Sequence, residues 1–526
     1  MNGGVPDLLP TIFRNSFWSA LACVAAPVIA FLFGGLTVRY VGIEAAGFST
    51  AVGAMLAIAG QFGSLGIGEA IVPALGAALG AGDRPRVRRL IGLAFLFAIA
   101  SSCLASIGLV LCTGAVIAWT RTKLPTEAAA SFIMITAGTA IVTALTGGLT
   151  CILRSASRHD LVTKVTVPLA ILRGVVGCVL VPLFPSLRTV AMINAVSALC
   201  DLPVLFVLAR RIVPETVRPS VSLAELPRLA RYGLWTSLTK LVSVMTGGVD
   251  DLVITGTCGA AALPPWTICK RLWLTMHTFL AQHVEHLIPT LGGVRETSRQ
   301  VFESIGAGMH WYVVVVAAAG YTFLSWAGPP VIAAVAGDEV AALCAWPLFS
   351  FSLAGVFWSL SVMPVISALA ASAASPGFIV ALCSNTVQLA TVVVLARSQG
   401  APAVYLAPLA VIPIVVATLG TSPARLFEPG LAWRRIRPTL VPLAFGVVGV
   451  LSGLAPGEGR TFLERTLGGA AMATAVGVLT LVTEDALGIN AQAHGQFVRA
   501  MRHGVAIARG FLRSFRVVRQ RSAAKP

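Results

Sequence analysis

The sequence predicts an all-α polytopic membrane protein with about 14 transmembrane helices, in two parallel-related six-helix bundles plus a C-terminal helix pair. Of the 526 residues, 56% are hydrophobic and only 11% are charged, whereas soluble proteins carry about 25% charged residues. Apolar runs of about 20 residues, the length that crosses a hydrocarbon core, recur along the chain. An internal repeat indicates the two bundles.

The repeat begins with the string LPTIFRNSFWSAL, which returns as LPRLARYGLWTSL 217 positions later. Both strings combine a leucine–proline pair, a basic residue (Arg14 or Arg231) and a tryptophan, followed by a long apolar run. The offset persists, because Gly42 after the first span aligns with Gly259 after the later one. Both copies enter the membrane from a basic side, so the repeat runs parallel about an axis normal to the membrane.

Short connections separate the apolar runs, so neighbouring spans are expected to form antiparallel hairpins. The expected spans are residues 14–38, 46–72, 90–119, 128–150, 165–184, 189–210, 231–257, 266–290, 303–326, 340–370, 377–396, 403–422, 439–456 and 465–483. The expected domains are the first six-helix bundle (1–212), the second (213–424), an extra transmembrane helix pair (425–484) and a basic amphipathic cytoplasmic tail (485–526).

The 38 lysines and arginines lie mostly on one side of these spans. The positive-inside rule therefore predicts an inner-membrane protein with both termini in the cytoplasm, and it explains the net charge of +17 without nucleic acid binding. In the tail, residues 496–520 carry apolar side chains at helical spacing with arginines mainly elsewhere. This pattern predicts a helix on anionic inner-leaflet lipids, or alternatively a docking helix for a partner protein.

Ionisable groups within spans are costly and usually face a cavity or each other. Arg173, near the middle of the fifth span, either binds a phosphate or an acidic sugar, or pairs with Asp201 at similar depth in the sixth span. Lys240 lies at comparable depth in the seventh span. We therefore interpret Arg173 and Lys240 as substrate-binding cations, one from each half, that face a central cavity.

Four charged residues are expected at similar depth in the seventh and eighth spans. Asp250 and Asp251 end one helix of this hairpin, and Lys270 and Arg271 begin the other. They predict an interhelical salt-bridge cluster that closes the outer end, or a gate whose pairing changes between states. Glu69, beside glycines at the inner end of the second span, is either a coupling carboxylate or an interfacial residue in water.

Several kinds of chemistry find no support in the sequence. A phosphate-binding G-x-x-x-x-G-K-[ST] loop is absent, so ATP hydrolysis is not expected to drive the protein. The HVEH string at 283–286 lacks the spacing of a zinc protease, and the ten cysteines form no CxxC pair. We therefore expect no catalytic residues, no metal and no cofactor.

Further strings carry a family resemblance: RNSFW before the first span, RYVGIEAAGFS after it, GIGEAIVPALGAALGAGDRPRVRRLIG around the second, and VDDLVITG with CKRL across the seventh and eighth. They resemble the polysaccharide and O-antigen flippases of the multidrug/oligosaccharidyl-lipid/polysaccharide exporter superfamily. Gly42, Gly47 and Asp250 match family positions, as do Gly66, Gly68 and the basic turn 84–89. The arginine-rich opening of the lipid II flippase branch is missing.

This resemblance implies two six-helix bundles around a central cavity. It also implies transport of undecaprenyl-diphosphate-linked glycan from the cytoplasmic to the periplasmic leaflet by alternating access, with a polysaccharide polymerase or glycosyltransferases as partners. The alternative is a cation-coupled exporter of small amphipathic compounds, which the extra helix pair disfavours. A membrane-embedded glycosyltransferase, polymerase or ligase is disfavoured because the expected outer loops are too short to carry a catalytic centre.

Overall fold

The computed structural model describes residues 27–64, 67–156, 158–227, 229, 248–285, 299–370, 375–416, 429–453 and 462–486. Every regular element within these ranges is a helix. Eight of the described helices are long and apolar enough to cross a membrane, and three shorter apolar helices accompany them. The all-α polytopic membrane fold expected from composition is therefore confirmed.

The first half contains the helix Pro27–Val41, α2 (Ile43–Ser64), α3 (Ile67–Gly80), α4 (Arg84–Leu111), α5 (Thr113–Trp119), α6 (Thr126–Ser155), α7 (His159–Leu183) and α8 (Leu187–Ile212). Two 3₁₀ turns, η1 (Pro214–Val217) and η2 (Leu223–Glu225), follow. The second half contains α10 (Asp250–Cys258), η4 (Ala260–Ala262), α11 (Leu263–Glu285), α13 (Arg299–Ala336), α14 (Asp338–Ala370), α15 (Ser375–Ser398), α16 (Ala401–Val404), η5 (Ala407–Ala410), α18 (Pro429–Ser452) and α19 (Phe462–Ala486).

Several expected spans differ from the helices observed, and the one expected at 403–422 corresponds to α16, η5 and a shorter apolar helix, Ala407–Val416. The span expected at 46–72 corresponds to two helices, α2 and α3, and the span expected at 90–119 corresponds to α4 and α5. Helix α4 also begins before residue 90, because Asp83 caps it by accepting a hydrogen bond from the Arg86 amide at 3.0 Å. Hydropathy places the start of this helix too late because its first turns carry arginines. Arginine is a good helix former, so these turns are helical although they are not apolar.

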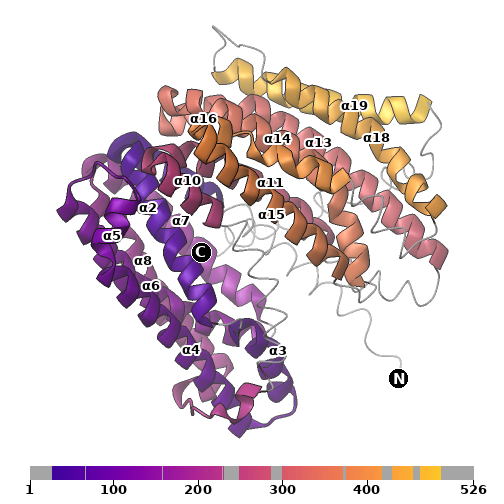
Figure 1. The fold of residues 1–526 in the computed structure, drawn as a ribbon. Helices are drawn as coiled ribbons and strands as arrows, with labels where there is room; N and C mark the ends of the chain where they lie inside the picture. Colours follow the sequence, from indigo (N-terminus) through magenta and orange to yellow (C-terminus); the bar gives the residue numbers. More distant parts are fainter. Residues whose placement is uncertain are drawn as a thin grey trace, which may run out of the picture.

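The helices pack into two groups that follow the order of the chain (Figure 1). In the first group α6 packs against α4 and α8, and α7 packs against α8. In the second group α13 packs against α14, α18 and α19. The groups meet where α2 contacts α10, η4 and α11, near the upper left of the view. Helix α2 is therefore the main described contact between the halves.

The internal repeat has a structural counterpart in two glycines. Gly42 separates the helix Pro27–Val41 from α2 with a φ of 110°. Gly259, 217 positions later, ends α10 with a φ of 91°. Such positive φ values are readily adopted by glycine and disfavoured for other residues. The equivalent glycines thus produce the same kind of helix break in each half.

A seam of small residues attaches α18 to α13. A methyl group on Gly446, Gly449 or Gly453 would collide with α13 side chains, so the two helices approach as closely as glycine allows. Trp326 of α13 donates from its indole nitrogen to the Gly449 carbonyl oxygen at 3.3 Å. Helices α18 and α19, the extra helix pair, therefore pack directly against α13 of the second half.

The segment that leaves α8 is fastened to the start of α4. The Ser220 amide donates to the Arg88 carbonyl oxygen at 3.1 Å. The buried Glu225 carboxylate lies 3.4 Å from Arg86 Nε and 3.6 Å from Arg89 Nη2. The basic turn that the sequence assigns to membrane topology thus also holds the segment between the halves.

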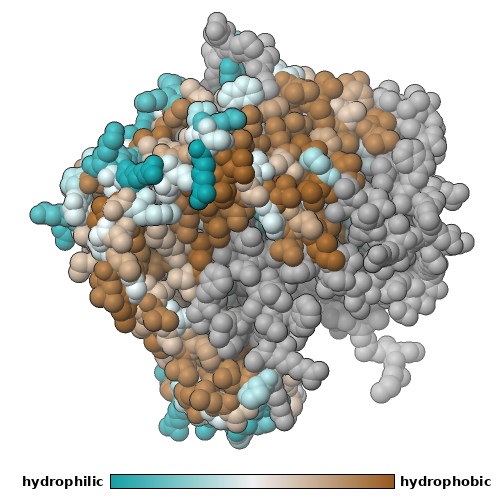
Figure 2. All heavy atoms as spheres, in the orientation of Figure 1, coloured by the Kyte–Doolittle hydropathy of each residue, from teal (hydrophilic) through white to brown (hydrophobic). Residues whose placement is uncertain are grey.

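The molecular surface has the pattern that a lipid environment requires. Figure 2 shows hydrophobic side chains over the middle of the first half and hydrophilic ones toward its two ends. Leu104 and Leu111 of α4 are 72% and 80% exposed. Exposed leucines in a continuous belt are unfavourable in water but suit contact with acyl chains. The belt supports a membrane-spanning orientation of these helices.

Candidate functional site: a buried ion cluster between the halves

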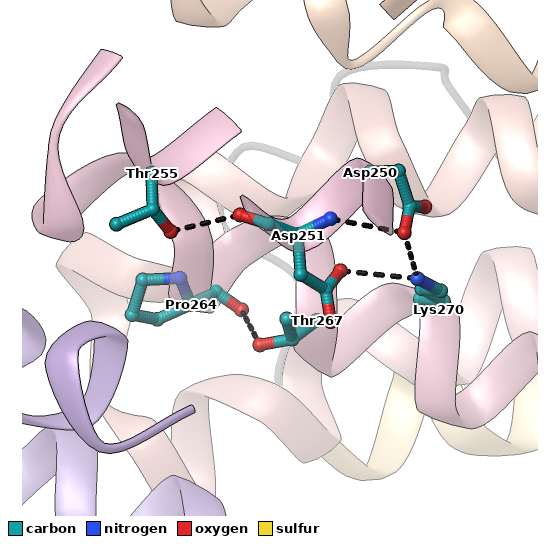
Figure 3. Close-up of polar contacts among 6 residues, drawn as sticks. All are labelled: Asp250, Asp251, Thr255, Pro264, Thr267 and Lys270. Carbon is teal, nitrogen blue, oxygen red and sulfur yellow. Dashed lines mark hydrogen bonds and ion pairs between the residues drawn. The ribbon is translucent and has the colours of Figure 1, made fainter. Parts of the chain in front are cut away.

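The α10–η4–α11 hairpin brings three charged residues together inside the protein (Figure 3). Asp250 and Asp251 occupy the first turn of α10, and Lys270 lies two turns into α11. The chain reverses at Gly259, so positions nearly twenty residues apart reach the same depth. The proximity expected from the sequence is therefore present.

The Lys270 ammonium connects the two carboxylates. Its Nζ donates to Asp250 Oδ1 at 2.6 Å and to Asp251 Oδ1 at 3.0 Å. Asp250 Oδ1 also accepts from the Asp251 amide at 2.9 Å. All three side chains are at most 8% exposed. Such short charge-assisted bonds in a water-poor setting are strong, but each depends on the others for charge compensation.

Arg271 completes the charge balance and extends the cluster toward the first half. Two carboxylates and one ammonium leave one negative charge, which the neighbouring guanidinium offsets through its electrostatic attraction to Asp251. Arg271 Nη1 lies 3.0 Å from where a methyl group on Gly34 would be, so it sits against the helix Pro27–Val41. Asp250 Oδ2 is buried and has no hydrogen-bond partner among the described residues, which leaves one acceptor of the cluster available.

Side-chain hydrogen bonds to backbone carbonyls join the two halves close to the cluster. Arg39 donates to the Ala334 carbonyl oxygen at 2.7 Å, and Arg121 donates to that of Thr257 at 3.0 Å. Both arginines come from the first half and both acceptors from the second. The sequence gives no sign of these acceptors, because they are backbone carbonyls that every residue carries.

A contact of backbone with backbone also joins the halves. A methyl group on Gly47 of α2 would overlap the Ala260 carbonyl oxygen in η4. The Ala260 amide donates to the Thr120 carbonyl oxygen at 3.1 Å. In the sequence, Gly47 stands out only because it matches a family position. In the structure, glycine is needed there because any side chain would overlap the Ala260 backbone. The halves are thus in direct contact at the end where α10 gives way to η4.

The remaining predicted site residues lie elsewhere or outside the described residues. Arg173 and Asp201 attract each other electrostatically, but within the described residues they form no ion pair within 4.0 Å. Arg173 instead lines a groove between α7 and α8. Glu69 is in the first turn of α3, but its side chain and all of Lys240 fall outside the described residues. A shared cavity of Arg173 and Lys240 therefore stays a prediction.

An aromatic group beside the cluster was not predicted. On α11, Trp273 stacks on His277 with ring centroids 5.6 Å apart, and Trp358 of α14 stands edge-on to both. His277 lies seven positions after Lys270, which places the two on one face of the helix. This seven-residue spacing is the sequence signal that could have placed His277 on the same helix face as Lys270. No group of three or more metal-ligating side chains occurs in the described ranges.

Two helical groups joined around buried charges define a polytopic membrane protein built from two halves. A family model described as "Polysaccharide biosynthesis protein" matches residues 38–341, more than half of the chain. The chain belongs to this family. The match includes the repeat glycines, both aspartates and the lysine of the cluster. No curated protein matches the sequence.

Solved structures share the fold. A lipid II flippase MurJ in an inward closed conformation aligns with a TM-score of 0.68 and 15% identity over 90% of this chain and 99% of its own. An inward-facing MATE family multidrug resistance transporter of the MOP superfamily aligns at 0.66 and 14%, over 77% and 98%. The Vibrio cholerae MATE transporter VcmN aligns at 0.56 and 14%, over 81% and 99%. The resemblance stated from the sequence is confirmed for family and fold.

Proposed function

We propose that this protein is a flippase for undecaprenyl-diphosphate-linked oligosaccharide, which it moves from the cytoplasmic to the periplasmic leaflet for polysaccharide biosynthesis. The membership of a polysaccharide biosynthesis family supports the pathway, and the fold shared with a lipid II flippase supports the transport step. The observation that carries the proposal is the buried ion cluster at the contact between two halves.

Alternating access requires contacts that hold one end of the protein shut and can be exchanged. The bonds from Arg39 and Arg121 and the Gly47–Ala260 approach join the halves at one end. Each can open without breaking a helix, because the acceptors are carbonyls at or near helix ends. We assign this end to the periplasmic side, and the cluster of Asp250, Asp251, Lys270 and Arg271 acts as its gate.

The substrate diphosphate needs cations within the membrane. Arg173 and Lys240 fill this role in the proposal, because guanidinium and ammonium groups pair strongly with phosphate where water is scarce. Asp201 and Glu69 are auxiliary polar residues. The protein acts without catalysis, in the inner membrane with both termini cytoplasmic, beside a polymerase or glycosyltransferases. The basic tail then lies on anionic lipids.

The deciding experiment measures surface polysaccharide in cells whose export depends on this gene. Arg173→Ala and Lys240→Ala should each abolish export and leave lipid-linked glycan on the cytoplasmic leaflet, with normal amounts of protein in the membrane. Arg397→Ala, at the exposed end of α15, is the matched control and should export normally. Normal export by both single variants and by the double variant would contradict the assignment of the cations.

A second candidate is a cation-coupled exporter of small amphipathic compounds. Its support is the nearly equal structural similarity to a MATE family multidrug resistance transporter. Expression in a drug-sensitive host distinguishes the two: an exporter confers resistance to dyes or drugs, whereas a flippase leaves sensitivity unchanged. Resistance that Lys270→Ala removes would favour the exporter over the flippase.

A further inference from the structure

An open groove runs along the surface between α7 and α8, apart from the ion cluster. It has a volume of about 390 Å³ and its lining is mostly apolar. Val176 and Leu180 come from α7, and Met192 and Val196 come from α8. Arg188 lies toward one end and Arg173 toward the other. A groove that is apolar along its length and cationic toward its ends suits an amphipathic molecule.

The length of the groove matches one membrane leaflet. On α8 the lining runs from Arg188 to Cys200. At about 1.5 Å per residue this stretch rises roughly 18 Å. A hydrocarbon core of about 30 Å gives each leaflet about 15 Å. The groove therefore accommodates a chain that begins at the membrane surface and ends near the midplane.

Arg188 lies where a lipid phosphate would be. It follows Ser186, the cap of α8, which accepts from the Thr189 amide at 3.1 Å. Its exposed side chain makes no ion pair or hydrogen bond with any other described residue. Arg173, at the deep end, has Asp201 as an electrostatic neighbour, although the two form no ion pair within 4.0 Å. Arg188 is the cation at the surface end of the groove.

We propose that this groove is a binding site for an anionic phospholipid. One acyl chain lies between α7 and α8, and the phosphate pairs with Arg188 in a charge-assisted contact. The occupant is a resident lipid of one leaflet, because the groove ends near the midplane. Arg173, the substrate cation of the proposed transport path, lines only the deep end of the groove, and the assignment of the lipid phosphate rests on Arg188 at the other end.

Native mass spectrometry of the detergent-purified protein tests the site, with dioleoyl phosphatidylglycerol and phosphatidylcholine as probes. The wild type should retain one phosphatidylglycerol in preference to phosphatidylcholine. Arg188→Ala should weaken phosphatidylglycerol binding about tenfold, as for the loss of one charge-assisted contact. Val196→Trp should block the groove and reduce binding of both lipids.

Matched controls separate the groove from the general lipid surface. Ile107→Trp places a tryptophan at an exposed position on α4, and Arg397→Ala removes an exposed arginine from the end of α15. Both controls should bind like the wild type. Melting temperatures confirm that each variant is folded. Equal phosphatidylglycerol binding by Val196→Trp and Ile107→Trp, or by Arg188→Ala and Arg397→Ala, would overturn the proposal.

Discussion

The Lys270 ammonium lies 2.6 Å from Asp250 Oδ1 in the interior of the protein, although twenty positions separate the residues. Neither charge would be stable there alone, because desolvating an unpaired ion costs several kcal/mol. Asp251 shares the same ammonium at 3.0 Å. The cluster thus links the start of α10 to the second turn of α11 in a way that depends on charge balance.

Replacing Lys270 by methionine should destabilise the protein strongly. The change leaves Asp250 and Asp251 buried side by side with only Arg271 to offset them. Breaking a buried ion pair by removing one partner costs about 3–5 kcal/mol. Thermal unfolding in detergent, followed by size-exclusion fluorescence, should show a markedly lower midpoint.

The triple variant Asp250→Asn, Asp251→Asn, Lys270→Met is the control for this effect. It removes the whole cluster and leaves no unpaired charge among the three, so much of the lost stability should return. Export should stay low if the charges form the gate. A triple variant that is no more stable than Lys270→Met would show that charge balance is not what the lysine provides.

Gly47→Ala should separate the halves at their closed end. The added methyl group overlaps the Ala260 carbonyl oxygen, and neither helix can yield without moving its half. Gly53→Ala on the same helix is the matched control, because nothing lies within 4 Å of its added carbon. Both substitutions raise helix propensity by the same amount, up to about 1 kcal/mol, so a difference between the two variants does not come from propensity.

The readout is the labelling rate of a cysteine introduced at Thr257 by a membrane-impermeant reagent. Gly47→Ala should raise this rate several-fold and reduce export, whereas Gly53→Ala should change neither. Identical labelling in the two variants would mean that the Gly47 contact does not keep this end closed.

Gly449→Val should loosen the extra helix pair from α13. The valine collides with Thr322 and displaces the backbone that accepts from Trp326. Overpacking at such a contact costs about 1–3 kcal/mol. Gly477→Val on α19 has open space around it and serves as control. Limited proteolysis should cut between α18 and α19 faster in the first variant only; equal rates would argue against the seam.

Glu225→Ala should free the segment between the halves. The change leaves Arg86 and Arg89 without the carboxylate that lies within 3.6 Å of both. Trypsin cleavage at Arg218 should accelerate several-fold in detergent, and high salt should accelerate it in the wild type as well. Glu127→Ala, an exposed acidic residue in the first turn of α6, is the control. Unchanged cleavage in Glu225→Ala would show that the contacts of Glu225 with Arg86 and Arg89 do not hold this segment.

The sequence predicts those features that depend on composition and on short-range geometry. The spans follow from hydropathy, and the Asp250–Lys270 proximity follows from a hairpin between two charged helix ends. The bonds from Arg39 and Arg121 could not be predicted, because their acceptors are backbone carbonyls that every residue carries. The same applies to the groove at Arg188, which depends on how α7 and α8 diverge in space.

The division of α2 from α3 shows the limit of hydropathy. Both helices are apolar, so one window spans residues 46–72 without a signal at the boundary. Glycines at 63, 66 and 68 are the only sequence cue, and glycine is also common in unbroken membrane helices. Packing of α3 against α4 and α6, which is long-range information, accompanies the division.

Holding residues 214–225 against α4 shortens the effective tether between the halves. A long tether lets two bodies separate and reorient freely, whereas a short one restricts them to rotation about a nearby point. The effective tether therefore begins after Leu229, which is buried in the core of the first half. The first half therefore carries the anchor point of this connection, and Arg86 and Arg89, which the sequence assigns to membrane topology, help to hold it in place.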